Sequence, residues 1–541
     1  MTSRPRLSLV LAGLALAWAT WFMGSRPLVA QPLTPVAGQP LILHRGIGPE
    51  PESLDPHRAR SEAALTVLRD LYQGLTELGS AGTPVLAAAD RCETSADGLT
   101  YTFHLRGGGR WSNGDRVVAE DFAAAWRRLV DSKTAAQYAQ LLAPVRGASA
   151  ITAGSAAPES LGVRAADDAT LVVDLVRPTP YFLGLLAHPA TFPIHRPSLA
   201  LNGRRFARPG VMISNGAFVL SGWDFGSHVS TRRNPYYWDR ANNSWDGVDY
   251  YSMPEAAAEF RAFRSGELDL TSTVPAAQAA WIRAHMAADL HLAPQLAVYY
   301  LGLNLTRPPF DKDPALRQAL SMVIDRERLV ASVTGLGEAP AYTLVPPQVF
   351  NYSPAVPPYA HWPLAQRIQR ARELLRASGL SRPFAVELRY NSGELHSRIA
   401  IAIASMWKEG LGIETILHAE EFKVLLQDID RGDTQVFRAS WIADYNDAYS
   451  FLQLMQSGFG INLPRYADGD FDALLARANQ SIDATQRREL LEKAEGLMMA
   501  NQPLIPIYFY VAAHLVGSQI RGWKDNPMNI VYSKSLTKDR Q

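Results

Sequence analysis

Strand-like and helix-like segments alternate along almost the whole chain, and this alternation restricts the possible folds more than any other feature. The strand-like segments alternate apolar and polar residues, whereas the helical ones repeat apolar residues every three or four positions. Predicted strands are 41–45, 100–105, 170–175, 217–220, 228–232, 298–305 and 385–390; predicted helices are 61–75, 119–130, 314–330, 364–378, 397–410, 470–478 and 485–500. This interleaving predicts an α/β architecture.

The length of the chain predicts more than one lobe. Its 541 residues exceed the roughly 250–300 residues at which a single hydrophobic core stops growing. Hydrophobic residues make up 47% and charged residues 19%, which is typical of a soluble globular protein. Because 53 Lys and Arg nearly balance 52 Asp and Glu, no overall field attracts nucleic acid or an anionic membrane, and we expect no nucleic-acid partner.

The N-terminus predicts export. Arg4 and Arg6 precede an apolar run from Leu7 to about Met23, and small or turn-forming residues follow it. This pattern is typical of a secretory signal peptide, assigned to residues 1–30, with a Pro-rich linker at 31–40. The run is slightly long and Leu28 replaces the usual small residue before the cut, so an uncleaved membrane anchor is the alternative.

Sequence motifs of enzymes are missing. Phosphate-loop, dinucleotide, zinc-protease and nucleophile-elbow patterns do not occur, and Gly107–Gly109 reads as a tight turn. The single cysteine, Cys92, excludes an intrachain disulfide, and the 12 histidines lack paired metal-ligand spacing. We therefore expect no catalytic residue, no metal and no cofactor.

One segment combines a carboxylate with large aromatic residues. Asp444 lies between Trp441 and Tyr445 within residues 438–451. A carboxylate buried there needs a cation or several hydrogen bonds, and the ammonium group of a ligand is one candidate. The alternative is structural, because Asp444, Asn446 or Asp447 can cap a helix that starts near residue 448, with Asp447 the best placed.

Taken together, a series of blocks resembles the family 5 solute-binding proteins of peptide ABC importers, and among them the periplasmic oligopeptide-binding proteins of Gram-negative bacteria. The blocks follow the family's order from about residue 41 to 530. They are Glu52–His57, Tyr101–Arg106, Trp111–Asp115, Asp121–Phe122, Pro180–Phe182, Ser214–Ala217, Tyr237–Trp238, Arg264–Asp269, Pro308–Phe310, Leu395–His396, Ala443–Asn446 and Pro506–Tyr510.

The resemblance implies a periplasmic-binding-protein-like fold of type II in its large three-domain form. Domain I comprises residues 41–72, 196–299 and 512–541, domain II residues 73–195, and domain III residues 300–511. Two main lobes close by a hinge around a ligand cleft between domains I and III. The implied function is peptide capture in the periplasm by a monomer that delivers its ligand to ABC permease subunits, without catalysis.

The resemblance also implies the residues of the ligand site. In the family, the aspartate of the Ala-Asp-Tyr-Asn motif pairs with the peptide's α-ammonium, and Asp444 matches it. Arg438 and His396 match groups that meet the peptide carboxylate, for which a guanidinium is well suited. The matching wall and cleft aromatics are Trp441, Phe422, Tyr138 and Tyr510.

Several positions depart from the oligopeptide-binding pattern. Arg60 replaces a glutamate near the ligand strand, Ser272 and Thr273 replace a tyrosine and an asparagine, and Ile429 replaces a second cleft arginine. All but Ile429 remain expected ligand-site positions. The alternative function is therefore a receptor of the same fold for murein peptide, dipeptide or another non-standard solute, with Arg60 favouring an additional ligand carboxylate.

A disulfide of the closest family members is absent from this chain. The resemblance places its two cysteines at Ala297 and Ile442. Both positions are substituted together, which agrees with Cys92 being the only cysteine.

Overall fold

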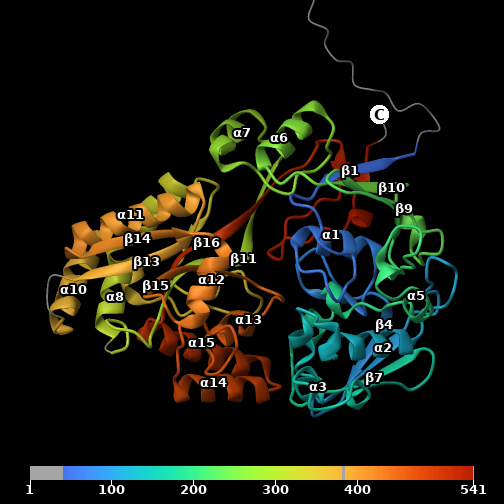
Figure 1. Ribbon diagram of the computed structural model, residues 1–541, viewed down its shortest axis with the longest axis horizontal. Coiled ribbons are helices and arrows are strands. Elements are labelled where there is room, and N and C mark those ends of the chain that lie inside the picture. Colours follow the sequence, from blue (N-terminus) through green and yellow to red (C-terminus); the bar gives the residue numbers. More distant parts are fainter. Residues whose placement is uncertain (1–39, 313, 381–383, 540–541) are drawn as a thin grey trace, which may run out of the picture. The chain divides into compact units, whose positions relative to one another are not determined.

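The computed structural model describes residues 40–312, 314–380 and 384–539. The described segments form one six-stranded sheet, two four-stranded sheets and two two-stranded ones (Figure 1). One four-stranded sheet has the order β1-β10-β9-β8, with β1 parallel to β10 and the other pairs antiparallel. Its strands are β1 (Ile42–Gly46), β8 (Phe218–Asp224), β9 (His228–Arg233) and β10 (Gly247–Tyr251).

The second four-stranded sheet is antiparallel throughout and packs against helix α2 (Ala119–Val130). Phe122 and Trp126 are fully buried on the inner face of α2. Asp121 fixes the start of α2, because its carboxylate accepts hydrogen bonds from the Val118 amide and the Trp111 indole, both at 3.0 Å. The strands are β4 (Ala89–Thr94), β5 (Thr100–Leu105), β6 (Val163–Ala165) and β7 (Thr170–Asp174).

The six-stranded sheet has the order β12-β16-β11-β15-β13-β14. Helix α11 (Glu394–Leu411) buries Ile403 and Trp407 in the same core as Tyr299 of β11. Helix α12 (Phe422–Arg431) instead buries Leu425 with Phe437 of β15 in a different core. The strands are β11 (Leu290–Leu303), β12 (Ala339–Pro340), β13 (Ala385–Asn391), β14 (Glu414–Glu420), β15 (Val436–Ile442) and β16 (Leu504–Leu515).

Strand β15 has a partly free edge. Along one side it pairs with β11 over its full length, from Val436 to Ile442. Along the other side β13 pairs only with Val436 and Phe437. Within the described part of the chain, residues 438–442 therefore have no strand partner on that side, and their outward backbone groups are available to another extended segment.

A helix is present in each predicted range, but one ends earlier than predicted and another is broken in the middle. The helix predicted at 61–75 is α1 (Glu62–Leu71), which Ser61 caps and which ends where Tyr72 becomes extended. The helix predicted at 314–330 breaks into α8 (Pro314–Met322) and α9 (Arg326–Leu329), because Asp325 caps the second one through the Arg328 amide.

The remaining elements complete the description. The other helices are α3 (Ala148–Thr152), α4 (Phe182–Leu185), α5 (Arg196–Asn202), α6 (Ala256–Ser265), α7 (Ala279–His285), α10 (Leu364–Ala377), α13 (Tyr449–Leu452), α14 (Gly469–Gln480) and α15 (Ala484–Asn501). The small strands are β2 (Thr76–Leu78), β3 (Pro84–Leu86), β17 (Ile520–Arg521) and β18 (Thr537–Lys538). In the described residues, no helix is both long and apolar enough to cross a membrane.

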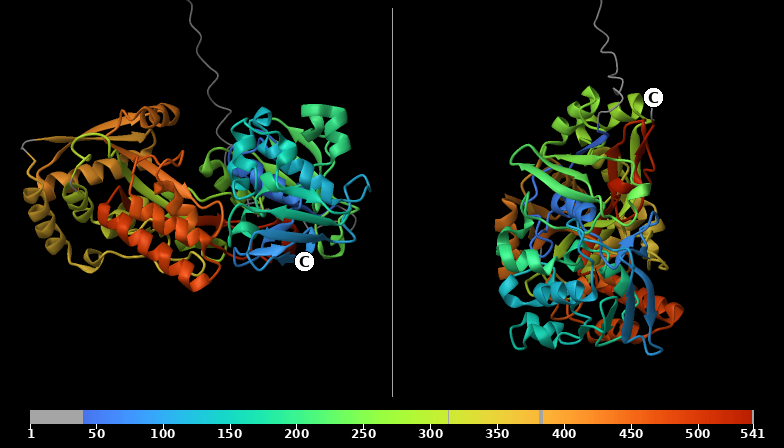
Figure 2. Two further views of the ribbon diagram at one scale, coloured as in Figure 1. Left: turned by 90° about the horizontal axis from the view of Figure 1, so that it is seen from below. Right: turned by 90° about the vertical axis from the view of Figure 1, so that its right-hand side faces the viewer.

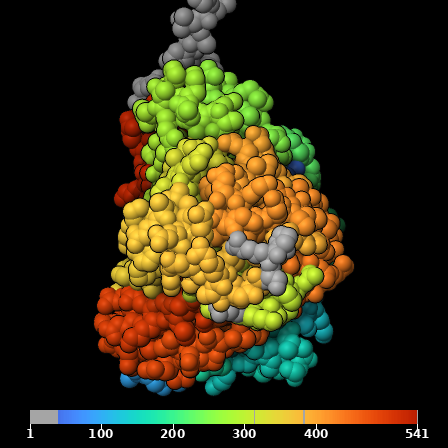
Figure 3. All heavy atoms as spheres, turned by 90° about the vertical axis from the view of Figure 1, so that its left-hand side faces the viewer, coloured from blue at the N-terminus to red at the C-terminus, as the bar shows by residue number. Residues whose placement is uncertain are grey.

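The division into domains I, II and III that the resemblance implies stays a proposal, and below these names stand for those residue ranges. In the left view of Figure 2 the yellow and orange elements, which include β13, β14 and β15, lie together, and Figure 3 shows the outer surface of the yellow and orange residues. The long strands β11 and β16 run across the expected boundaries at 299/300 and 511/512. The C-terminal segment returns to domain I, where the Ser533 amide donates to Asp70 at 3.0 Å and the Trp245 indole donates to the Leu536 carbonyl at 2.7 Å. The predicted signal peptide and most of the linker lie outside the described residues.

Candidate functional site

A cavity of about 360 Å³ brings together residues from domains II and III. Asp444 and Trp441 come from the end of β15 and the turn after it, and Arg177 and Tyr181 come from the segment after β7. Amide side chains and apolar groups complete the wall. They include Gln140, Leu141, Leu185, Tyr445, Tyr449, Gln453, Gln456, Phe459, Ile461, Asn479 and Gln480.

The Asp444 carboxylate has no polar partner in the described structure. The backbone amide of Asp444 donates to the Ser450 hydroxyl at 3.3 Å, and the Trp441 indole donates to the same hydroxyl at 3.5 Å, but no described residue donates a hydrogen bond to the carboxylate or forms an ion pair with it. Burial alone raises the pKa of Asp444 to about 7. The cavity therefore contains a carboxyl group whose charged form a bound cation would stabilise.

Asp447 performs the structural role that the sequence left open. Its carboxylate accepts a hydrogen bond from the Tyr449 amide at 2.8 Å, at the start of α13. The same carboxylate binds both terminal nitrogens of Arg487, each at 2.8 Å. Ala448 is the N-cap residue of α13, but the carboxylate that binds the first amide of this helix and the counter-ion of Arg487 both belong to Asp447, and Asp444 lines the cavity.

Tyr138 approaches Asp444 from domain II. Its ring lies 4.3 Å from the ring of His188, centroid to centroid. Burial and, next, the charge of Asp444 raise the pKa of Tyr138 to about 12. This electrostatic contact places two predicted site residues near one another, although they are about 300 positions apart in the sequence.

Three tyrosines pack together where domains II and III meet, and the sequence analysis did not select them. The Tyr181 ring stacks on that of Tyr445 with centroids 4.7 Å apart and on that of Tyr449 at 5.5 Å. A second cavity of about 360 Å³ shares Tyr181 and Tyr445 with the first and includes Arg487. The available signal was the Pro180–Phe182 block, which contains Tyr181, but nothing in the sequence shows which segment it meets.

A second group of predicted residues surrounds Arg438. Its guanidinium donates to the Tyr510 hydroxyl at 3.1 Å and to the Asn391 amide oxygen at 3.3 Å. It also lies 4.8 Å above the Tyr299 ring. His396 is adjacent, 3.5 Å from the Tyr299 hydroxyl, and burial followed by repulsion from Arg438 lowers its pKa to about 4. Arg438 is thus the charged member of this group at neutral pH.

The other predicted residues lie outside the cavity that contains Asp444. Arg60 is exposed, and Glu52 accepts a hydrogen bond from its backbone amide. The Ser272 hydroxyl and amide both bind the buried carboxylate of Glu259, at 2.7–2.9 Å, and Thr273 beside it is exposed. Phe422 begins α12 with 51% of its surface exposed. Their roles in binding remain predictions.

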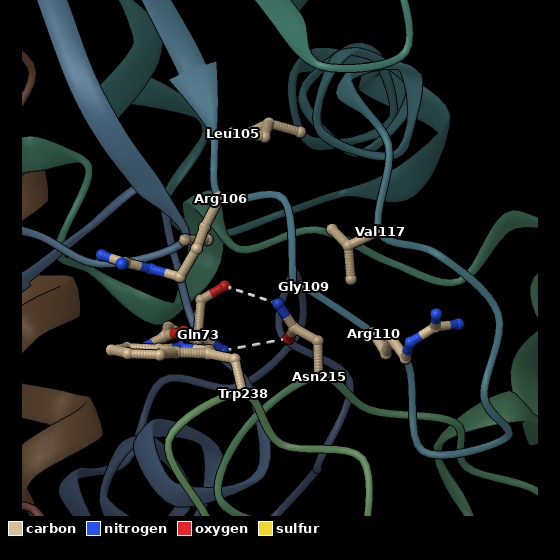
Figure 4. Close-up of a pocket in the computed structure, with 9 residues that line it drawn as sticks. Gln73, Leu105, Arg106, Gly109, Arg110, Val117, Asn215 and Trp238 are labelled. Atoms are coloured by element: carbon tan, nitrogen blue, oxygen red, sulfur yellow. Dashed lines mark hydrogen bonds between the residues drawn. The ribbon is translucent and has the colours of Figure 1, made fainter.

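A small pocket around Gln73 joins domains I and II (Figure 4). The Gln73 backbone amide donates to Asn215 Oδ1 at 3.0 Å, and Asn215 Nδ2 donates to the Gln73 carbonyl at 2.9 Å. Arg106 lies 4.0 Å above the Trp238 ring. Its volume is only about 10 Å³, roughly the space that one water occupies. This pocket is a structural junction and not a ligand site.

Metal-binding groups do not cluster in the part of the chain that the structure describes. No set of three or more His, Cys, Asp or Glu side chains there is arranged to hold a metal ion. Cys92 is a half-buried free thiol on β4, and burial followed by the nearby Glu93 raises its pKa to about 11.

Ala297 and Ile442 are directly opposite each other. They are paired residues of β11 and β15, and neighbouring strands place such side chains on the same face. The register therefore agrees with the disulfide position that the resemblance assigned to them.

A family model and individual proteins match this chain. Residues 83–462 match the bacterial extracellular solute-binding proteins, family 5 middle region. The chain is 37% identical over 529 residues to the probable deoxycholate-binding periplasmic protein YgiS of Escherichia coli, covering 96% of this chain and 98% of that protein. It is 35% identical over 500 residues to the periplasmic oligopeptide-binding protein OppA of Salmonella typhimurium, covering 91% and 92%.

Solved structures match over a similar extent. The structure of the Escherichia coli murein tripeptide binding protein MppA superposes with a TM-score of 0.81 at 33% identity, over 92% of this chain and 99% of that one. A complex of OppA from Haemophilus influenzae with the peptide RPPGFSPFR has a TM-score of 0.79 at 32% identity, over 92% and 99%.

Proposed function

Because the chain belongs to the bacterial extracellular solute-binding proteins of family 5, we propose that it captures oligopeptides in the periplasm and delivers them to an ABC permease. The match to the family model confirms the family predicted from the sequence, and the match to the MppA structure confirms the α/β periplasmic-binding fold. Relatives named for oligopeptide and murein peptide binding match almost the whole chain, which supports a peptide ligand.

The observation that carries the proposal is the unpaired Asp444 in its cavity. An ammonium ion supplies the positive charge and the three donors that this carboxylate lacks. A carboxylate with a pKa near 7 costs little to leave protonated in the empty protein and becomes ionised when a cation arrives. Asp444 is therefore suited to bind the α-ammonium of a peptide.

The free edge of β15 supports an extended ligand. Residues 438–442 offer backbone donors and acceptors on the side that β13 does not cover, and a peptide that pairs there is bound through its main chain. Its amino end lies at Asp444, just beyond Ile442. Arg438 lies further back along the same strand and is suited to a carboxylate, with His396 beside it as a neutral donor.

Broad specificity follows from this mode of binding. The strand edge and Asp444 read groups that every peptide possesses, while the cavity walls carry amides such as Gln140, Gln453 and Gln480 that can hold water. Closure of the lobes by a hinge then encloses the ligand. We expect side-chain identity to change the affinity less than loss of the ammonium does.

Three further properties belong to the proposal. The protein binds its ligand without altering it, since the proposed site contains an acid and an arginine but no activated nucleophile. Residues 1–30 direct export, or anchor the protein if they are not cleaved, and the mass of the exported protein distinguishes the two. The protein acts as a monomer.

A second candidate ligand is an amphipathic acid. The relative at 37% identity carries the name of a probable deoxycholate-binding protein, and the cavity combines aromatic walls with Arg177. Murein peptide, from the relative MppA, remains the alternative within the peptide class.

Thermal stability separates these candidates. The exported protein is unfolded and refolded to remove bound ligand, and its melting temperature is measured with tri- to pentapeptides, murein tripeptide and deoxycholate. A ligand that binds only the folded state raises the melting temperature, by an amount that grows with the logarithm of its concentration relative to its Kd. A rise with peptides supports the proposal, whereas a rise with deoxycholate alone contradicts it and favours the amphipathic acid.

A further inference from the structure

We infer that Arg177 forms a second charged subsite of the cavity, which binds a carboxylate close to the amino end of the ligand. The inference rests on the proposed function, because it takes the ligand's ammonium to lie at Asp444. It assigns a specificity-determining role to a residue that neither the sequence motifs nor the family resemblance identified.

Arg177 is a partly buried cation without a carboxylate partner among the described residues. It lines the same cavity as Asp444, and its Nε is buried without a hydrogen-bond partner among the described residues. In that part of the chain no carboxylate forms an ion pair with it. Its neighbours are the hydroxyls of Tyr181, Tyr449 and Tyr445, and Tyr181 is also a hydrogen-bond partner. These hydroxyls are neutral, so no opposite charge compensates that of Arg177.

Arg487, a second arginine in this region, has a carboxylate partner and is a structural residue. Its guanidinium lies 5.5 Å from the Tyr181 ring centroid, so both arginines contact the same tyrosine group. Asp447 neutralises Arg487 through two hydrogen bonds of 2.8 Å. Arg177 lacks any such partner, and a forked guanidinium is the side chain best matched to the two oxygens of a carboxylate.

Asp444 does not neutralise Arg177. Both residues line the cavity, but no hydrogen bond or ion pair joins the Asp444 carboxylate to the Arg177 guanidinium in the described structure. The cavity thus holds one acidic and one basic group that are separate from one another, and a complementary ligand carries an ammonium and a carboxylate.

The size of the cavity places that carboxylate near the ammonium. Its volume of about 360 Å³ is at the lower end of the roughly 300–1,000 Å³ of small-molecule pockets. The C-terminus of an extended peptide on β15 lies in the opposite direction, towards Arg438. The carboxylate at Arg177 therefore belongs to the first residues of the ligand.

Asn479 adds a polar group to the same wall. It is 5% exposed, and its Oδ1 is buried with no hydrogen-bond partner among the described residues. An amide can present either its oxygen or its nitrogen to a ligand. Two polar atoms without a described partner, Arg177 Nε and Asn479 Oδ1, thus belong to residues that line a cavity whose other walls are largely aromatic and amide.

Two sources supply the required chemistry. One is an acidic side chain on the first residue of a peptide, as in Glu-Ala-Ala. The other is the free α-carboxylate of a γ-linked glutamate, which murein peptides carry next to their first residue. Both place a negative charge a few bonds from the ammonium. The subsite therefore distinguishes either ligand from neutral peptides, but charge alone does not distinguish the two ligands from each other.

The test compares Glu-Ala-Ala with Gln-Ala-Ala by isothermal titration, because the two differ by one charge at nearly equal shape. The refolded wild-type protein is expected to bind Glu-Ala-Ala roughly tenfold more tightly. Arg177→Gln should reduce this ratio to about one without weakening the binding of Gln-Ala-Ala. Arg164→Gln is the matched control, since it removes an exposed arginine from the same domain and should leave the ratio unchanged.

Each outcome bears on a different claim. Equal affinities in the wild type, or a preference that survives Arg177→Gln, overturn the subsite while leaving peptide capture intact. If neither peptide binds, the proposed function fails and the inference fails with it. Murein tripeptide in the same titrations identifies the source, since its affinity should fall with Arg177→Gln if its γ-linked glutamate is the carboxylate bound. If Arg177→Gln does not fold, Arg177→Met, which also removes the charge, takes its place with the same expected result.

Discussion

Asp444 and Glu495 are two carboxyl groups with the same acidity and opposite surroundings. Burial raises the pKa of each to about 7. Glu495, on α15, is fully buried and accepts hydrogen bonds from the Val345 amide and the Tyr352 hydroxyl at 2.8 Å and from the Ala355 amide at 3.1 Å. Asp444 accepts none from the described residues and lines a cavity.

The difference shows why a shifted pKa does not by itself identify a ligand site. Glu495 holds together the segment from Val345 to Ala355, so its burial is accounted for by the fold. The Asp444 carboxylate binds no described residue, and under the proposal its desolvation is compensated when a ligand supplies a cation. The empty cavity and the missing partner together, rather than the acidity, distinguish a binding carboxyl from a structural one.

The largest expected effect separates the two residues through ligand affinity. Asp444→Asn keeps the shape of the side chain but removes the charge that pairs with the peptide ammonium, so we expect peptide affinity to fall by roughly 30- to 1,000-fold. Glu495→Gln should leave peptide affinity within about twofold, because Glu495 lies outside the cavity. Isothermal titration of a tripeptide measures both, and similar losses in the two variants would remove the distinction.

Stability should respond in the reverse order. At pH 6, Glu495→Gln replaces one carboxylate oxygen with an NH₂ group, which faces a hydrogen-bond donor such as the Val345 amide or the Tyr352 hydroxyl. The free energy of unfolding should fall by about 1–3 kcal/mol. Asp444→Asn removes no hydrogen bond and should leave the free energy of unfolding of the empty protein unchanged or slightly higher. Urea unfolding of the ligand-free variants measures these differences, and a large loss of stability for Asp444→Asn would show that its carboxyl is structural.

The pH dependence of binding sharpens the comparison further. The empty protein holds a proton on Asp444 below pH 7, and pairing with an ammonium requires its release, so affinity should fall by up to about tenfold per unit as the pH drops from 7 to 5. Above pH 8 it should fall again, because the peptide's α-amino group, with a pKa of about 7.7–8.0, loses its charge. Titrations in buffers of different ionisation enthalpy should reveal the released proton, and a flat profile would contradict an ammonium at Asp444.

The stability of the empty protein should also depend on pH. Both acids have a folded pKa above the unfolded one, so their favourable contribution is complete below about pH 4 and is lost as the pH rises through 7. The loss is at most about 1.4 kcal/mol per pH unit for each carboxyl. Asp444→Asn and Glu495→Gln should each flatten the decline in melting temperature between pH 5 and 8, and the double variant most of all.

The sequence predicted those parts of the fold in which the residue pattern is local. The α2 helix has the predicted bounds, and α10, α14 and α15 begin and end within two residues of them. The first half of β11 was missed, because Pro294 and Gln295 interrupt its alternation and a bulge between Pro294 and Val298 shifts its register with β16. The break between α8 and α9 was missed because apolar residues continue through Val323 and Ile324.

The site was predictable only where one segment contains it. Asp444 stands out in its own motif, but the sequence could not decide between cap and ligand roles. The contacts of Asp447 account for the structural role, and the ligand role of Asp444 stays a proposal. Arg177 precedes a proline in what reads as an extended loop, and its significance arises only where domain II meets domain III. Contacts between segments far apart in the chain produce no periodic pattern in the local sequence, so the sequence around Arg177 could not predict them.

The binding of a tripeptide and its N-acetylated form to the refolded wild-type protein tests the central claim most directly. Acetylation removes the ammonium and leaves the rest of the peptide intact. If Asp444 binds that ammonium, isothermal titration should show saturable binding of the free peptide and a loss of affinity on acetylation of at least about 30-fold, and the two peptides should bind Asp444→Asn equally weakly. Equal, tight binding of the free and acetylated peptides to the wild-type protein would contradict the account.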